Sequence, residues 1–180
     1  MVTDDELTHA AARHLAHSPN ASMNEIAQAA GVSRATLFRR HPNRAQLVAE
    51  LSERAVRAYI SAVDAAEPEE GEATEALTRL VKHLAPLAPT YGLLALQPIE
   101  PSVERALLAE AQACDDRLRR LFRRGQRDGA YTLELSPGWM LTMITWLIVG
   151  AADSLRQGSL APADLKPYLT TTIVSAALRR

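Results

Sequence analysis

Residues 22–44 read SMNEIAQAAGVSRATLFRRHPNR, and this stretch decides the fold of the N-terminal part of the chain. It predicts two short helices with only Gly31, Val32 and the capping residue Ser33 between them. A turn that short sets the two helices at a steep angle, which is the helix-turn-helix arrangement. Gly31 suits the turn because glycine adopts the left-handed backbone conformation at little steric cost. Ala27 is small where the two helices come closest.

Three helices in this region have a marked start. Thr3 and Glu6 have the spacing of a capping box, and so do Ser22 and Glu25. In this motif the hydroxyl accepts a hydrogen bond from the third helical amide, while the carboxylate accepts one from the amide of the capping residue. Ser33 is expected to cap the second helix of the pair. The N-terminal part is therefore predicted to contain three helices.

The second helix of the pair presents a polar face at its N-terminal end. An α-helix fits the major groove and reads base edges chiefly with its first turn. Arg34 can make a bidentate contact to guanine, and Thr36 can use its hydroxyl on phosphate or its methyl on thymine. Residues 33–44 contain four arginines and no acid, a charge of +4 in a chain whose formal net charge is −1. This local positive charge predicts binding to the DNA backbone.

Composition narrows the possible function classes. The chain has 180 residues, 47% hydrophobic and 23% charged, which is the ordinary balance of a globular protein. A single cysteine, Cys114, excludes an internal disulfide framework and a multi-cysteine metal site. The single cysteine, together with the lack of a signal-peptide pattern, predicts a cytoplasmic location. The longest apolar stretch, 139–152, has 14 residues and is interrupted. A membrane span needs about 20, so no membrane partner is expected.

The fold class is predicted as all-α. Spacings of three and four between apolar residues recur, and no stretch alternates as a strand would. The acidic segment 67–72 contains Pro and Gly and is the best candidate break. Helices are expected at about 73–85, 90–97, 102–127, 137–157 and 162–178. The predicted domains are a helix-turn-helix DNA-binding domain over 1–47 and a helical regulatory and dimerisation domain over 48–180, with a linking helix at about 44–66.

The segment 139–150 is apolar all round as a helix. Such a helix must be covered on every side. In a chain of this size we expect one side of this helix to face the core. Another side, together with the last helix, is expected to face a second subunit. This predicts a homodimer joined through the last two helices of each subunit. A monomer with one deep core is the alternative.

Trp139, Met143 and Trp146 fall on one stripe of that helix. A stripe of this kind is more often core than pocket. Both tryptophans of the chain lie here, however, and large rings with an adaptable methionine suit an apolar ligand site. Tyr91, on a short and irregular helix, is a second candidate. Few polar groups accompany these residues, so the expected effector is small and apolar or aromatic.

Six arginines crowd the end of the helix expected at 102–127. We interpret them as a solvated face that complements the negative helix C-terminus. A phosphate-bearing ligand such as an acyl-CoA is the alternative. They are Arg117, Arg119, Arg120, Arg123, Arg124 and Arg127.

The sequence contains no catalytic or cofactor motif. Glu6 and His9 have metal-ligand spacing, but a di-iron bundle needs two such pairs and two further carboxylates. Neither an enzyme nor a bound metal or cofactor is expected.

With these features the sequence resembles the tetracycline-repressor (TetR) family. The resemblance implies a homodimeric regulator, in most members a repressor, with a three-helix DNA-binding domain followed by a helical domain that holds the dimer interface and an inducer pocket. The matching segments are Ile26–Ala27, Ala30–Ser33, Ala35–Phe38 and Pro42-x-Arg44, with weaker matches at Gly125-Gln126-x-x-Gly129 and 150–153.

Carried over by position, the resemblance implies DNA contacts for a set of side chains. Those expected on phosphate are Ser22, Arg39 and Arg44, and those expected on bases are Ser33, Arg34, Ala35 and Thr36. Three features depart from the family pattern. Phe38 stands where a tyrosine usually donates to phosphate. Arg40 and His41 stand where aromatic residues are usual and can return phosphate contacts. The N-terminus is acidic and lacks a basic arm.

The predicted function is that of a ligand-responsive transcriptional repressor. It binds palindromic double-stranded operator DNA as a homodimer and is released by a small hydrophobic effector. The ligand favours a conformer whose two reading helices no longer match successive major grooves. The alternative is a helical ligand- or protein-binding dimer of the same fold that has lost sequence-specific DNA binding. Phe38 and the acidic N-terminus motivate this alternative.

Overall fold

The computed structural model describes residues 3–90 and 103–179, and helices are its regular elements there. The prediction of an all-α fold is confirmed. The helices are α1 (Asp4–His17), α2 (Met23–Ala29), α3 (Arg34–Arg40), α4 (Arg44–Ala66), α5 (Ala73–Leu84), α7 (Arg105–Arg127), α8 (Pro137–Gln157) and α9 (Leu165–Ala177). Two 3-10 turns, η1 (Ala85–Leu87) and η2 (Pro162–Asp164), follow α5 and precede α9.

The predicted helix starts are confirmed in atomic detail. Thr3 caps α1 and Ser22 caps α2, each in a capping box completed by Glu6 or Glu25. Ser33 caps α3 by accepting a hydrogen bond from the amide of Thr36. Asn43 caps α4 in the same way, and Gly31 has a φ of +66° in the turn between α2 and α3. These caps satisfy amides that have no partner within the helix, so short helices form where the sequence places them.

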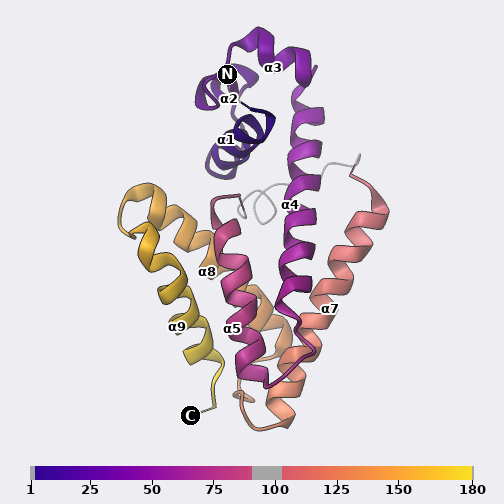
Figure 1. Cartoon of the computed structure of the whole chain (residues 1–180), viewed down its shortest axis with the longest axis vertical. Coiled ribbons are helices and arrows are strands. Elements are labelled where there is room, and N and C mark those ends of the chain that lie inside the picture. Colours follow the sequence, from indigo (N-terminus) through magenta and orange to yellow (C-terminus); the bar gives the residue numbers. More distant parts are fainter. Residues whose placement is uncertain (1–2, 91–102, 180) are drawn as a thin grey trace.

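Helices α1, α2 and α3 gather around the start of α4 at one end of the molecule (Figure 1). Their apolar faces share one core with the first turns of α4. The largest of its fully buried side chains are Leu7, Leu15, Ile26, Leu37, Leu47 and Leu51. Because α4 contributes to this core and then continues into the rest of the molecule, it ties the two parts together.

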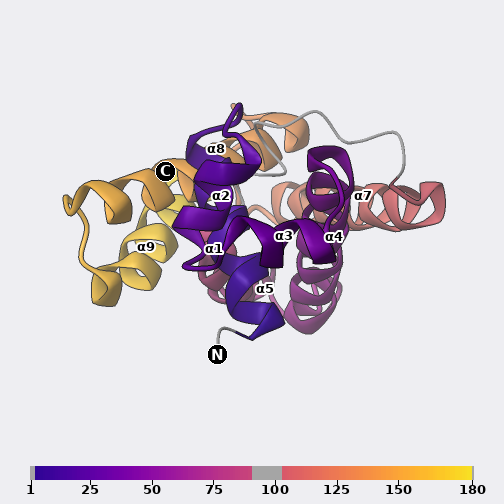
Figure 2. The same ribbon diagram turned by 90° about the horizontal axis from the view of Figure 1, so that it is seen from above.

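The remaining helices form a second, larger body. Helix α5 packs against α4, α7 and α9, and α8 packs against α7 and α9. Figure 2 shows α7 on one side of α5 and α9 on the opposite side. Leu77, Leu80, Leu118, Phe122 and Ile148 are among the buried side chains of this core. The body thus has its own hydrophobic core.

The turn between α7 and α8 explains one of the weaker sequence matches. A Cβ atom on Gly125 would lie 2.2 Å from the ring of Tyr131, so only glycine lets this buried ring lie on α7. The hydroxyl of Tyr131 donates to the carbonyl oxygen of Ala73 at 2.5 Å. Gln126 donates to the carbonyl oxygen of Thr132, which holds the same turn.

Some predicted boundaries differ from the structure. The helix expected over 73–85 ends at Leu84 and tightens into η1 at Pro86. The last helix begins at Leu165, after the 3-10 turn that Pro162 opens. The segment 137–157 is helical over its full predicted length. The helix expected at 90–97 lies, except for Thr90, outside the described residues.

The six arginines of α7 differ in their surroundings. Arg117 forms ion pairs with Asp64 and Glu69, and Arg124 donates to the carbonyl oxygens of Pro68 and Glu69. For these two the expectation of a solvated face is wrong, because they hold the acidic turn between α4 and α5. Arg119 pairs with acids on its own helix, whereas Arg120, Arg123 and Arg127 are exposed.

Candidate nucleic-acid interface

Helix α3 is anchored on one side and exposed on the other. Leu37 is fully buried in the N-terminal core, which fixes the rotation of α3 about its axis. The amide of Thr36 lies 3.1 Å from Oγ of Ser33, and the Thr36 hydroxyl lies 2.9 Å from the same oxygen. The first turn of α3 is therefore ordered before any partner binds.

The outward face of this first turn carries Ser33, Arg34 and Ala35, all of them exposed. The Arg34 guanidinium carbon lies 5.0 Å from the centre of the Phe38 ring, a cation–π contact that holds the arginine along α3. Arg39 is exposed as well and forms no ion pair or hydrogen bond within residues 3–90 and 103–179. Its charge is free for a phosphate group.

Arg40 is exposed but already paired. Its guanidinium lies 3.2 Å from the carboxylate of Asp4. Asp4 also accepts a hydrogen bond from Arg54 of α4 at 2.9 Å, and Asp5 accepts one at 3.1 Å. The acidic residues at the start of α1 thus bind two arginines of this domain.

His41 lies inside the domain, with 4% of its surface exposed. Its Nδ1 lies 3.3 Å from the carboxylate of Glu50, and its buried Nε2 has no hydrogen-bond partner among the described residues. A contact between this ring and DNA stays a prediction and would require the ring to leave its place.

Arg44 and Ser22 are engaged in local structure at the start of α4 and of α2. Nε of Arg44 donates to the carbonyl oxygen of Ala21 at 3.2 Å, and a terminal nitrogen donates to the carbonyl oxygen of Pro19. The hydroxyl of Ser22 donates to the carboxylate of Glu25 at 2.7 Å. Both side chains stabilise the turn between α1 and α2, and their contacts with phosphate remain predictions.

The arginine that joins α1 to α4 was not found by sequence reasoning. Arg54 binds Asp4, Asp5, Thr8 and Glu50. Three of these partners lie in α1, about fifty positions away in the chain, and periodicity carries no signal for pairs so distant. The charge of Arg54 is fully used within the protein.

The stripe proposed for the effector lies on the outer face of α8. Trp139 is 58% exposed and Trp146 is 51% exposed, while Met143 between them is half-buried. Trp146 lines a shallow groove of about 410 Å³ between α8 and α9, together with Gly150 and Tyr168. The fourth predicted ligand residue, Tyr91, lies outside the described residues.

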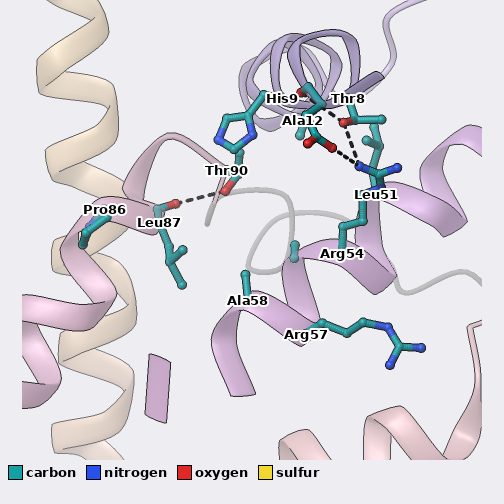
Figure 3. Close-up of a pocket in the computed structure, with 12 residues that line it drawn as sticks. Thr8, His9, Ala12, Leu51, Arg54, Arg57, Ala58, Pro86, Leu87 and Thr90 are labelled. Atoms are coloured by element: carbon teal, nitrogen blue, oxygen red, sulfur yellow. Dashed lines mark hydrogen bonds and ion pairs between the residues drawn. The ribbon is translucent and has the colours of Figure 1, made fainter. Parts of the chain in front are cut away.

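A separate cavity of about 470 Å³ lies between α1, α4 and η1 (Figure 3). In this view Arg54 reaches toward Thr8, whose hydroxyl accepts its hydrogen bond at 3.1 Å. On the opposite wall the hydroxyl of Thr90 donates to the carbonyl oxygen of Leu87 at 3.2 Å. The cavity therefore lies at the junction between the N-terminal domain and the helical body.

Solved structures share this architecture over almost their whole length. The regulator LfrR of Mycobacterium smegmatis, solved with proflavine, has a TM-score of 0.68 and 24% identity, covering 98% of this chain and 96% of its own. PfmR of Thermus thermophilus has a TM-score of 0.62 and 20% identity, covering 100% and 99%. A regulator of Saccharomonospora viridis, solved with choline, has a TM-score of 0.61 and 21% identity, covering 98% and 97%. At these identities the likeness shows a common fold.

An all-helical body that carries a helix-turn-helix at one end defines the class of DNA-binding transcription regulators. Residues 7–51 match the model of the bacterial regulatory proteins, tetR family. The N-terminal domain is therefore of the tetR type, and the fold of the whole chain is similar to that of TetR-like regulators. No curated protein matches the chain significantly.

Proposed function

We propose that the chain is a ligand-responsive repressor of the cytoplasm that binds palindromic operator DNA as a homodimer. A small hydrophobic effector releases it from the operator. The observation that carries this proposal is the exposed first turn of α3, which offers Ser33, Arg34 and Ala35 while Leu37 fixes the helix from behind. Arg39, which is exposed and has no partner among the described residues, supplies the phosphate contact beside it.

The surface of α8 supports the homodimer. Within the described residues, α8 is the helix whose length and composition would allow it to cross a membrane, yet only 22% of its most apolar window is buried in one chain. Trp139 and Trp146 on α8 and Tyr168 on α9 lie largely in solvent. A second copy of α8 and α9 would cover these rings in a four-helix interface.

The division into 1–47 and 48–180 is part of the same proposal, with α4 as the linking helix whose first turns pack into the N-terminal core. The N-terminal core includes Leu47, Val48 and Leu51 from the start of α4, and the core of the body begins at Tyr59. A movement of α4 would therefore move the reading helix α3.

Two of the structural neighbours support a small-molecule effector. LfrR was solved with proflavine and the regulator of Saccharomonospora viridis with choline. In this chain Trp139, Met143 and Trp146 remain the proposed apolar contacts. Because they share the face that we assign to the dimer, an effector there would touch both subunits.

To test this proposal, fragments of the host genome that the protein binds are selected to find the operator. The affinity of the protein for this operator is then measured at several salt concentrations. Arg39→Ala should weaken binding to all sequences alike and reduce the salt slope by about 1. Arg120→Ala, which removes an exposed arginine from α7, is the matched control. It should leave both the affinity and its salt slope unchanged. Equal, shallow binding of wild type and variants to every duplex would instead favour the helical ligand- or protein-binding dimer.

A further inference from the structure

A second cavity, of about 620 Å³, lies where the N-terminal domain meets the helical body. One wall is α1, and the opposite wall is formed by the end of α8 and the start of α9. Figure 1 shows α1 above the end of the body at which α8 turns into α9. The volume falls in the range of pockets that hold small organic molecules, about 300–1,000 Å³.

The polar part of this cavity is basic. Arg13, His14 and His17 line it from α1, and Arg156 lines it from α8. Asp153 neutralises Arg156, since its carboxylate lies 2.7 Å from a guanidinium nitrogen. Arg13 forms no ion pair in the part of the chain that the structure describes. Among the described residues, Arg13 therefore gives the lining a positive charge that no ion pair balances.

The basic groups influence one another through space. Burial lowers the pKa of His17, and the positive charge of Arg156 lowers it further, with Asp153 acting in the opposite direction. His14 adds a smaller repulsion of the same sign as Arg156. An anion placed between these groups would relieve the repulsion and gain charge-assisted hydrogen bonds.

The rest of the lining is apolar and, apart from Ala10 of α1, comes from the helical body. Leu155 of α8 and Leu165 of α9 line the cavity, and Pro86 and Pro89 complete the apolar part. Ala152 leaves space between them. Apolar walls with a few convergent charged groups are the ordinary make-up of a small-molecule site.

We propose that this cavity binds a small organic anion, a carboxylate on an apolar skeleton. The carboxylate lies between Arg13 and the two histidines of α1, and the skeleton lies against Leu155, Leu165 and the prolines. The neighbouring cavity of Figure 3 does not offer this chemistry, because its Arg54 is already bound by Asp4, Asp5 and Glu50.

The location gives such a ligand a regulatory role, and this part rests on the proposed function. A molecule that contacts α1 on one side and α8 and α9 on the other binds best at one relative position of the two domains. It therefore shifts the equilibrium between positions of α3. By linkage, operator DNA and the ligand change each other's affinity by the same factor.

Calorimetric titration of the protein without DNA tests the site itself. The probes are 2-naphthoate, 4-phenylbenzoate and decanoate, each compared with its uncharged amide. At least one carboxylate should bind about tenfold more tightly than its amide, and Arg13→Ala should remove that advantage. Arg57 is an exposed arginine of α4 outside the lining of this cavity, so Arg57→Ala is the control. This variant should still bind the carboxylate more tightly than the amide.

A filling variant separates the cavity from mere surface charge. Ala10→Phe adds a ring to the α1 wall without changing any charge and should abolish binding of the same carboxylate. If no carboxylate binds better than its amide, or if Ala10→Phe binds as well as wild type, the proposal is wrong. Operator affinity without any ligand is measured separately. If the ligand-free protein does not bind operator DNA, the proposed function is contradicted, whereas the titration result for the cavity still holds.

Discussion

Arg44 and Ala21 join the beginning of α4 to the turn between α1 and α2 through a hydrogen bond of 3.2 Å from Nε to the carbonyl oxygen. The same guanidinium also donates to the carbonyl oxygen of Pro19. The sequence predicted a backbone contact with DNA for Arg44, and the structure adds an internal role. This arginine fixes the end of α1 relative to α4, on which the position of α3 depends.

Arg44→Ala should therefore destabilise the N-terminal domain even without DNA. It leaves two carbonyl groups without a charged donor, which predicts a loss of about 1–3 kcal/mol in the free energy of unfolding. Urea denaturation of wild type and variant measures this. Arg57→Ala removes an exposed arginine of α4 that has no partner within residues 3–90 and 103–179, and it should change stability by less than about 0.5 kcal/mol. A loss as small for Arg44→Ala would contradict the internal role.

Local signals in the sequence predicted the fold well. The caps at Thr3, Ser22 and Ser33 and the glycine at the turn are short-range devices, and each is present as expected. Helix 137–157 has the predicted bounds because Ser136 and Pro137 mark its start, and Gly158 takes the left-handed conformation at its end.

Side-chain pairing over long distances could not be predicted in this way. Arg40 and Arg44 look alike in sequence, yet one pairs with Asp4 and the other with the α1–α2 turn. His41 was expected at the DNA surface, but the fold turns its ring toward Glu50 and buries it. These pairings depend on how α1 packs on α4, and local sequence patterns carry no information about that packing.

Gly125→Ala should destabilise the helical body although alanine is the better helix former by about 1 kcal/mol. The new Cβ would meet the Tyr131 ring, which is held by Phe122 and by its hydrogen bond to Ala73. Overpacking of this kind costs about 1–3 kcal/mol net. Thermal denaturation measures the loss. In a Tyr131→Leu background the same glycine change should cost clearly less, because the ring that it meets is absent.

Acid should loosen the turn between α4 and α5. The hydrogen bond from Arg117 holds the pKa of Glu69 below its ordinary value, despite an opposing effect of burial. The stabilisation is therefore complete above the pKa of a free glutamate, about 4.3, and is lost as the pH falls through the lower pKa of the folded state. Glu69→Gln should flatten the decline in stability over that acidic range, as followed by urea unfolding between about pH 3 and 7. An unchanged decline would contradict this assignment.

Phe38→Tyr should strengthen operator binding. The half-buried ring lies beside Arg34 on α3, and the added hydroxyl would supply the phosphate donor that the family pattern places at this position. One such hydrogen bond is worth about 0.5–1.5 kcal/mol, or about a two- to tenfold gain in affinity. Titration of labelled operator measures the gain, with an unrelated duplex beside it. Because the contact is to phosphate, the affinity for the unrelated duplex should rise by a similar factor. If variant and wild type bind both duplexes with equal affinity, the added hydroxyl does not contact a phosphate.

Trp146→Glu should dissociate the proposed dimer. The ring is half exposed in one chain and lies beside the groove formed with Tyr168 of α9, so in a four-helix interface a carboxylate at this position would be buried without a partner. Sedimentation equilibrium should show a shift from dimer to monomer, and operator affinity should fall because two half-sites are no longer held together. Leu133→Glu places the same charge on a side chain that is 72% exposed in the turn before α8 and serves as the control. A dimer that survives Trp146→Glu but not Leu133→Glu would place the interface on another surface.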